Sequence, residues 1–473
     1  YWPFLADATL NMSGGVLDFK NQGILINDTP VYSLNDNITG GIIRASGGFT
    51  GNRADFTPSA GTFEFYGGSD YTISQSNGCT LHDVVINKSA KEGDENSLSA
   101  PVYDKRSGEL LSDGSKANTI YLTSDFTITG NLTVENGSLT LNQKTLNVNR
   151  NCYVQSTLNM TNAADVLNVG TYWNDWLEFQ SGSTANVTNG TINCYGWIIP
   201  RTGSNFNLGI DNTVYLKGEN SGGISNFEPS ATYGNLVIAK NAGNYAVIDG
   251  IATEPVVING DFTISADNTF RTQYNRMTVH GEFTDAASSV IQVLFGSSKG
   301  NEVYTSATKE PVVVKPGRTD YYLEIDSEFD LKGQLIINYN GHVYVHSRFS
   351  SSPGSSIKID NGSFISDAPN HPDKGWQYLN GNLTLINGLF EITNNSVNFG
   401  GTATSSVSGG IIRTGGAFYA THTGVFQPSG GVVEITGSNP DGAIYCFNSN
   451  HFHNLTISRT GGYSQFMWGE PVL

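Results

Sequence analysis

Two histidines near the end of this sequence are spaced so that they could share a metal ion. His451 and His453 stand two positions apart, so on a β-strand their side chains would lie on one face, roughly 6–7 Å apart. His342 and His346 would be ~13 Å apart on a strand, which is too far for a single ion. No third ligand is spaced to join His451 and His453, so we predict no metal site and no cofactor.

Three tryptophans could stack against sugar rings. Trp173, Trp176 and Trp197 offer large aromatic faces that would suit a carbohydrate. If Trp173 and Trp176 belong to one strand, their i, i+3 spacing points them to opposite faces, so at most one of them would join such a surface. The alternative is that these indoles fill the core or form a lateral interface.

Acid–base chemistry on a polysaccharide would need carboxylates gathered on one face, usually with Arg or Lys. In this sequence Asp18, Glu64, Glu178, Glu391 and Glu434 stand singly. Asp18 and Glu391 occupy equivalent positions of repeated segments, and so do Glu64 and Glu434. This recurrence indicates a structural role. No nucleophile-elbow, zinc-protease or phosphate-loop motif is found. We therefore predict no enzymatic activity, with a polysaccharide lyase or hydrolase as the alternative.

Asn-x-Ser/Thr sequons are frequent, and the abundance of Asn, Ser and Thr accounts for most of them by chance. Glycosylation would nevertheless suit a secreted surface. The candidate acceptors are Asn27, Asn87, Asn131, Asn136, Asn189, Asn382 and Asn454.

A long internal repeat indicates the scaffold that carries these residues. Segments 40–89 and 409–460 both open with Gly-Gly-Ile-Ile-Arg, continue to a Phe-x-Pro-Ser turn and close on an alternating strand. A third Phe-x-Pro-Ser turn lies between them. In these turns we expect Phe to plug the core and Pro to preset the backbone. The turn residues are Phe56 and Pro58, Phe227 and Pro229, and Phe426 and Pro428.

The segment 119–149 shows the clearest short period. The fragments FTI, NLTV, SLTL and TLNV follow one another at about seven residues, and alternation within each gives one buried and one exposed face. Three such strands per turn would make a coil of roughly twenty residues. The pattern predicts an all-β fold, a right-handed parallel β-helix or solenoid built from diverged repeats. Tandem β-sandwich domains with antiparallel pairing are the alternative.

The composition excludes several partners. The 473 residues carry a net charge of −17 and only 14% charged residues, which argues against nucleic-acid binding but is compatible with structural calcium. No apolar run approaches the roughly 18 residues of a membrane span. Four distant cysteines, Cys79, Cys152, Cys194 and Cys446, favour buried thiols and leave their disulfide state open.

We divide the chain into four modules of one continuous solenoid: 1–117 with a charged loop at 89–117, then 118–250, 251–373 and 374–473. The chain starts part-way into a module, and it ends on the Glu-Pro-Val phrase that precedes a strand after Glu254. We therefore expect a segment of a longer repeat polymer.

The phrases GNLTVENGSLTLNQKTLNV, GGIIRTGGAFYATHTGVFQPSGGVVEITGS and FHNLTISRT resemble the repeats of large secreted surface proteins of environmental anaerobic bacteria. The resemblance covers most of the chain, weakly in 271–373. It implies a parallel β-helix at the cell surface or outside the cell, with no established catalytic residues. We expect a structural protein of a fibre, filament or sheath, assembled from copies of itself by head-to-tail and lateral β contacts. An adhesin that binds cell-surface glycans is the alternative.

Overall fold

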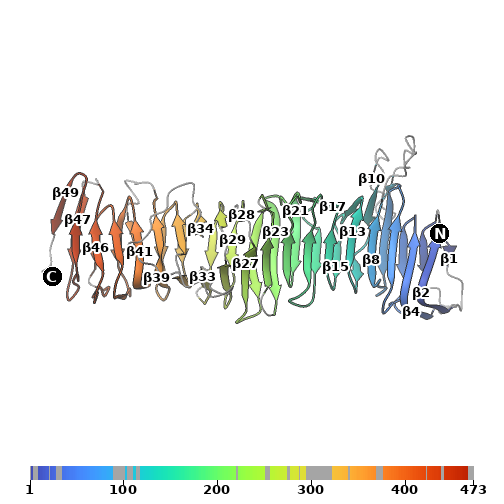
Figure 1. Ribbon diagram of the computed structural model, residues 1–473, viewed down its shortest axis with the longest axis horizontal. Helices are drawn as coiled ribbons and strands as arrows, with labels where there is room; N and C mark the ends of the chain where they lie inside the picture. The colour runs from blue at the N-terminus through green and yellow to red at the C-terminus, as the bar shows by residue number, and fades with distance from the viewer. Residues whose placement is uncertain are drawn as a thin grey trace. The chain divides into compact units, whose positions relative to one another are not determined.

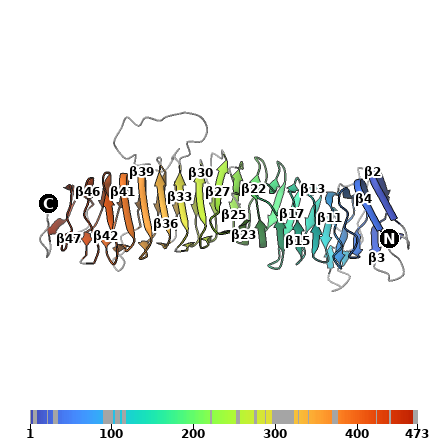
Figure 2. The ribbon, with the colours of Figure 1, turned by 90° about the horizontal axis from the view of Figure 1, so that it is seen from below.

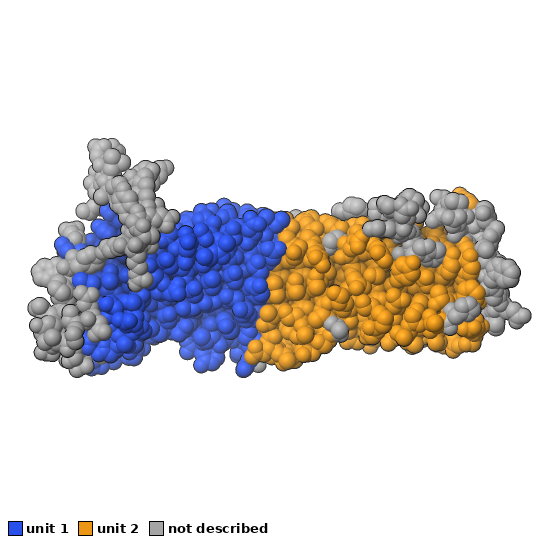
Figure 3. Space-filling view, turned by 180° about the vertical axis from the view of Figure 1, so that it is seen from behind, with its two compact units in different colours: residues 1–235 blue, residues 236–473 orange. Residues whose placement is uncertain are grey.

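A computed structural model of the chain shows a β-solenoid of about 16 turns, in which parallel strands are stacked in coils. The residues described are 2–3, 9–20, 22–27, 35–88, 102–103, 110–112, 118–219, 222–228, 230–250, 256–273, 277–286, 288–294, 322–326, 328–338, 341–368, 376–421, 423–437 and 441–466. Among them no helix is present, and hence none that could cross a membrane. The chain divides into two compact units, 1–235 and 236–473 (Figure 3); the division into four modules stays a prediction.

In residues 119–200 of unit 1 each coil contributes one strand to each of three faces, which we call A, B and C (Figure 1), whereas the parallel strands before residue 119 belong to faces A and B. Face A holds β3 (Ile24–Asn27), β5 (Phe49–Asn52), β7 (Tyr71–Ser76), β11 (Thr119–Leu122), β14 (Ser138–Thr140), β17 (Thr157–Met160) and β20 (Thr184–Val187). Face B holds β2 (Thr9–Phe19), β4 (Asn35–Ala45), β6 (Thr62–Tyr66), β8 (Asp83–Asn87), β13 (Leu132–Asn136), β16 (Cys152–Val154), β19 (Trp176–Phe179) and β22 (Trp197–Pro200). Face C holds β12 (Phe126–Ile128), β15 (Thr145–Val148), β18 (Val166–Val169), β21 (Asn189–Cys194) and β23 (Asp211–Gly218).

The short period of the sequence corresponds to this coil. The fragments FTI, NLTV and SLTL form β12, β13 and β14 on three different faces, and TLNV forms β15, which pairs in parallel with β12. Asn147 on β15 donates to Thr127 on β12, 20 residues earlier. The predicted coil of roughly twenty residues is confirmed.

Unit 2 is built in the same way, with three parallel ladders. One ladder, which we call face C of unit 2, holds β29 (Phe262–Ile264), β32 (Phe283–Asp285), β35 (Phe329–Leu331), β38 (Phe349–Ser351), β40 (Trp376–Leu379), β42 (Ser396–Phe399), β45 (Phe418–Ala420), β47 (Asp441–Cys446) and β49 (Tyr463–Phe466). A second holds β28 (Val256–Ile258), β31 (Met277–Val279), β34 (Tyr322–Ile325), β37 (His342–Val345), β44 (Ile411–Thr414), β46 (Val432–Ile435) and β48 (Leu455–Ile457). The third holds β27 (Tyr245–Gly250), β30 (Thr269–Gln273), β33 (Val290–Leu294), β36 (Gln334–Asn338) and β43 (Ser405–Val407), and the long strands β39 (Ser356–Ser366) and β41 (Asn382–Ile392) serve both of the last two ladders (Figure 2).

Parallel pairing holds throughout the strand pairs of both units. The exception is the pair β9 (Val102–Tyr103) and β10 (Leu110–Ser112), which is antiparallel. Tandem β-sandwiches would require antiparallel sheets, so that alternative is wrong. The rest of the predicted charged loop 89–117 lies outside the described residues.

Inward side chains of successive coils stack into columns, because parallel pairing in register sets like positions one above the other. On face B of unit 1, Leu132, Cys152, Leu177 and Ile198 form one such column and are at most 1% exposed. In unit 2 the face C column is aromatic. Its phenylalanines, with ring centroids 4.9–5.8 Å apart along Phe262, Phe283, Phe329 and Phe349, bury a large apolar area per coil.

The backbone conformation explains why the GGIIR phrase keeps glycine at its second position. Gly41 and Gly410 occupy equivalent positions and adopt φ of 88° and 76°. An L-residue is disfavoured there, and a Cβ on Gly41 would lie 2.9 Å from the carbonyl oxygen of Gly15 in the preceding coil. The repeat therefore keeps glycine where the chain turns sharply against its neighbour.

Candidate functional site

The recurrent carboxylates lie beside the arginine of the GGIIR phrase. In the first copy Asp18, Arg44 and Glu64 occupy one register position on β2, β4 and β6. Arg44 Nη2 donates to Asp18 Oδ2 over 3.0 Å, and Tyr66 donates to Asp18 Oδ1 over 2.8 Å. Burial opposes ionisation of Asp18, but these two hydrogen bonds outweigh it and lower the pKa of the carboxyl group.

The second copy forms a complete bridge. Arg413 on β44 donates to Glu391 on β41 over 3.0 Å and to Glu434 on β46 over 2.8 Å. Burial alone would lower the pKa of Arg413, but its hydrogen bond to Glu434 and the charges of both carboxylates raise it. Because each arginine pairs with at least one carboxylate of a neighbouring coil, these groups act as ties between coils. Arg201 and Glu178, 2.9 Å apart, make a similar tie in unit 1.

A second kind of tie in unit 2 uses histidine. His346 lies between Asp367, 2.7 Å from Nδ1, and Glu324, 2.7 Å from Nε2. The hydrogen bonds to Asp367 and Glu324 raise the pKa of His346 to about 10, so the ring is an imidazolium at neutral pH. His280 and Asp326 form a related pair at 2.6 Å.

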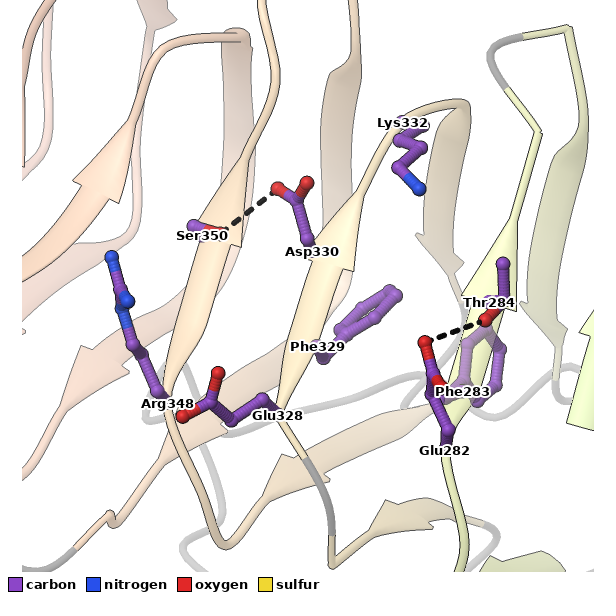
Figure 4. A pocket seen from close by; sticks show the side chains of 9 residues that line it. All are labelled: Glu282, Phe283, Thr284, Glu328, Phe329, Asp330, Lys332, Arg348 and Ser350. Atoms are coloured by element: carbon purple, nitrogen blue, oxygen red, sulfur yellow. Dashed lines mark hydrogen bonds between the residues drawn. The ribbon is translucent and has the colours of Figure 1, made fainter. Parts of the chain in front are cut away.

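A polar groove of about 310 Å³ lies on the outer side of face C in unit 2 (Figure 4). Three successive strands form it: β32, β35 and β38, whose phenylalanines Phe283, Phe329 and Phe349 pair with one another. The residues before these phenylalanines, Glu282, Glu328 and Arg348, line one side. The residues after them, Thr284, Asp330 and Ser350, line the other side, and Lys332 closes its end.

This groove was not predicted from the sequence. Carboxylates stand singly along the chain, yet the groove brings Glu282, Glu328 and Asp330 together on one face with Lys332 and Arg348. A signal was present in the sequence: Glu-Phe-Thr, Glu-Phe-Asp and Arg-Phe-Ser each place a charged residue before a phenylalanine and a polar one after it. Coil register is what aligns these tripeptides.

The tryptophans considered for sugar stacking lie near one another in unit 1. Trp176 and Trp197 are register partners on β19 and β22, half-buried on the outside of face B, and Tyr153 contacts Trp176 edge-on at 6.5 Å. Trp173 is 49% exposed in a turn before β19, so the strand parity assumed for it does not apply. Gly196 allows the turn before β22 to lie close to the turn before β19, because a Cβ on Gly196 would lie 1.9 Å from the carbonyl oxygen of Asp175.

The Phe-x-Pro-Ser turns contribute to the core. Phe56 and Phe426 are at most 1% exposed, and the latter has its ring centroid 5.0 Å from those of Phe399 and Phe418. Pro58 and Pro428 are buried beside them. Phe227 is only partly buried, and its ring centroid lies 4.9 Å from the guanidinium carbon of Arg201, so the core position expected for this phenylalanine is wrong. Pro229 lies outside the described residues.

His451 and His453 flank the buried Phe452, so they lie on the outer side of the chain. His451 Nδ1 is 3.1 Å from the carbonyl oxygen of Ser449. No group of three or more His, Cys, Asp or Glu side chains that could hold a metal ion occurs in the part of the chain that the structure describes.

Several sequon asparagines already use their amide nitrogens within the fold. Asn87 donates to Glu64, Asn131 to Asp83, Asn136 to Asn87, and Asn454 to the carbonyl oxygen of Gly431, all over 2.8–3.3 Å. Asn189 and Asn382 instead accept hydrogen bonds through their side-chain oxygens, from Gly190 N and Thr404 Oγ1. Asn27 ends β3.

The sequons also have a structural explanation. In an outward-facing strand of a solenoid, positions i and i+2 are both polar, so Asn and Thr there create Asn-x-Thr whatever the glycan state. Asn131-Leu132-Thr133 is an example, since its central leucine is buried.

The four cysteines are free and buried, which answers the question that their spacing left open. Burial raises the pKa of Cys152 to about 12 and that of Cys446 to about 11. Both thiols are therefore protonated at neutral pH and are poor nucleophiles.

Comparison with known proteins adds no relative: no family model, no curated protein and no solved structure matches this chain.

Proposed function

We propose that the chain is a structural protein, a β-solenoid segment of an extracellular fibre, filament or sheath. The observation that carries the proposal is the recurrent tie between coils. At equivalent positions of two distant segments, an arginine joins a carboxylate of a neighbouring coil. In these two segments the arginines and carboxylates hold successive coils in register.

The mechanical consequence follows from the pairing. Among the described residues, successive coils are joined by parallel strand pairs on two or three faces, and the inward columns are closely packed. Separating two coils along the axis therefore breaks several backbone hydrogen bonds at once, together with an apolar contact and, in places, an ion pair. Copies that associate head-to-tail by the same strand pairing would form an open filament, because a heterologous contact that does not close propagates.

Electron microscopy of the purified chain over a range of concentrations tests the proposal. We expect fibres or sheets that become more abundant as concentration rises. Arg413→Glu, which sets three carboxylates on neighbouring coils, should reduce them. Lys358→Glu is the matched control, because Lys358 is exposed on β39 and belongs to no tie. Single, unassociated particles at all concentrations would contradict the proposal, and immunolabelling of intact cells tests the extracellular location.

A carbohydrate-binding role is the second candidate, and the aromatic side chains of face B favour it. Trp176 and Trp197 stand side by side on neighbouring strands with Tyr153 against the first, and such faces suit sugar rings. Binding to immobilised glycans that is lost in Trp176→Ala and Trp197→Ala, but kept in Tyr121→Ala on face A, would support this role. Equal binding by all four proteins would contradict it.

A further inference from the structure

The groove on face C of unit 2 differs from every charged cluster described above in how its cations are used. Arg44, Arg201 and Arg413 each form an ion pair with a carboxylate on a neighbouring coil. Lys332 and Arg348 line the groove without an ion pair to any residue of the chain that the structure describes. In addition, Arg348 Nε is shielded from solvent and has no hydrogen-bond partner there. Two cations are therefore available to an incoming anionic group.

A buried carboxylate fixes the backbone of Lys332. Asp285, which is 2% exposed, accepts hydrogen bonds from the backbone nitrogens of Lys332 and Gly333 over 3.0 and 2.6 Å and from Ser289 over 3.3 Å. These bonds hold the turn after β35 from which the Lys332 side chain extends over the groove (Figure 4). The backbone of Lys332 is thus anchored at one end of the groove by a buried carboxylate.

The remaining lining suits hydroxyl groups. Asp330 accepts from Ser350 over 2.9 Å, and Glu282 accepts from Thr284 over 3.2 Å. Carboxylates and hydroxyls of this kind can exchange such internal bonds for bonds to a ligand, and carboxylates accept strong charge-assisted hydrogen bonds. Polar side chains follow one another on three strands at the strand spacing of about 4.8 Å, so a chain of sugar rings along the direction of stacking meets a carboxylate or a hydroxyl on each strand.

The groove does not suit a peptide. Its phenylalanines Phe283 and Phe329 are at most 3% exposed, so they offer no apolar pocket for a side chain. The three strands are already paired with one another, so within the groove an extended peptide finds no free edge. A volume of about 310 Å³ lies at the lower end for small-ligand sites.

We propose that this groove binds an acidic oligosaccharide whose sugar carboxylates pair with Lys332 at one end of the groove and with Arg348 at the other, while its hydroxyls donate to Glu282 and Asp330. The ligand lies across β32, β35 and β38, along the direction in which the coils stack. This inference stands apart from the structural role, because fibres can form whether or not the groove binds a sugar.

Calorimetric titration of the whole chain tests the proposal with three probes: a trisaccharide of galacturonic acid, the matched neutral galactose trisaccharide, and a sulfated galactose trisaccharide. We expect the uronate to bind at least tenfold more tightly than either of the other two. Lys332→Ala and Arg348→Gln should each weaken its binding at least tenfold, whereas Lys358→Ala, which removes an exposed cation outside the groove, should change it less than twofold. Hydrogen exchange in β35 and β38 should be unchanged in the two groove variants, which separates loss of binding from loss of fold.

Several outcomes would overturn the proposal. Absence of binding to the uronate at millimolar concentration would exclude the site. Equal affinity for the neutral trisaccharide would exclude recognition of a carboxylate, and tighter binding of the sulfated sugar would exclude a uronate as the ligand class. An equal loss of affinity in Lys358→Ala would show attraction to the protein's general charge instead of binding in the groove.

Discussion

The two GGIIR segments set an arginine at the same register position, yet they use it differently. Arg413 is bound on both sides, by Glu391 and by Glu434, and its side chain is 22% exposed. Arg44 pairs with Asp18 alone, and its side chain is 40% exposed. The same sequence phrase therefore gives an arginine with two ion pairs in unit 2 and an arginine with one ion pair in unit 1.

Two exchanges explain the difference. Asp18 stands where the second copy has a glutamate, so its carboxylate reaches one methylene less far. Tyr66 stands where the second copy has Thr436; it donates to Asp18 over 2.8 Å, and its ring centroid lies 5.3 Å from the guanidinium carbon of Arg44. A phenol and a cation–π contact replace part of an ion pair. Such interchange is expected of a structural position, because several side-chain sets can hold two coils together.

The largest effect should come from the turn phenylalanines. Phe426→Ala should lower the local free energy of unfolding by about 3–5 kcal/mol, because a buried aromatic side chain leaves a cavity. Phe56→Ala should cost less, since Phe56 has one aromatic neighbour, Phe63 at 6.1 Å, whereas Phe426 has three. Hydrogen exchange in the strands next to each turn measures both. An equal or larger loss at Phe56 would show that the two turns are equivalent after all.

The second-largest effect should come from replacing the two arginines, and the loss of stability should differ between them. Arg413→Met should destabilise its coils by about 1–3 kcal/mol, because it leaves the part-buried Glu391 and Glu434 without a cation to pair with. Arg44→Met should have a smaller effect, because the Arg44 side chain is more exposed than that of Arg413 and Tyr66 still donates to Asp18. Hydrogen exchange on either side of each arginine gives the two values. Restoration of stability when Glu391→Gln and Glu434→Gln are added to Arg413→Met would confirm that the loss comes from unpaired charge.

Much of this scaffold follows from the sequence. The strands β12 to β15, their recurrence after one coil and the buried turn phenylalanines Phe56 and Phe426 were predicted, because period-2 alternation and turn residues are local signals. The hand of the coil, the extracellular location and the assembly stay predictions.

The groove could not be predicted by the same means. Glu282 and Glu328 are far apart in the sequence because a long segment, in part outside the described residues, separates β32 from β35. Only the pairing of Phe283 with Phe329 places them side by side. When coils differ in length, the sequence does not show which strands pair, because local patterns do not determine long-range pairing.

A pH series separates the two kinds of cation that tie coils in unit 2. Asp367 and Glu324 raise the pKa of His346 to about 10, above the ordinary value of about 6.5. The stabilisation from this tie is therefore complete below about pH 6.5 and is lost as the pH rises through about 10. The Arg413 tie stays charged over that range. Proteolysis rates between pH 7 and pH 11 should rise near the His346 coils first, and His346→Gln should remove that dependence. NMR of the imidazole gives the pKa directly, and a value near 6.5 would contradict the prediction.

The smallest effect should be found in the uncharged ladder of face C in unit 1. Asn193 donates to Asn168 over 2.8 Å, and Asn168 donates to Asn147 over 2.7 Å, so all amides point toward the preceding coil. Asn168→Ala removes both bonds and should cost about 1 kcal/mol. Asn168→Asp keeps an acceptor for Asn193 but sets a carboxylate against the Asn147 oxygen. It should therefore be less stable than the alanine variant at pH 7 and recover as the aspartate is protonated at low pH.

Hydrogen exchange in β18 and β21 at pH 7 compares the two variants, and thermal unfolding at pH 3 tests the recovery. If the aspartate variant matched the parent at pH 7, the direction of the amide ladder would have no energetic consequence. Coil stacking would then depend on the backbone and the inward columns alone.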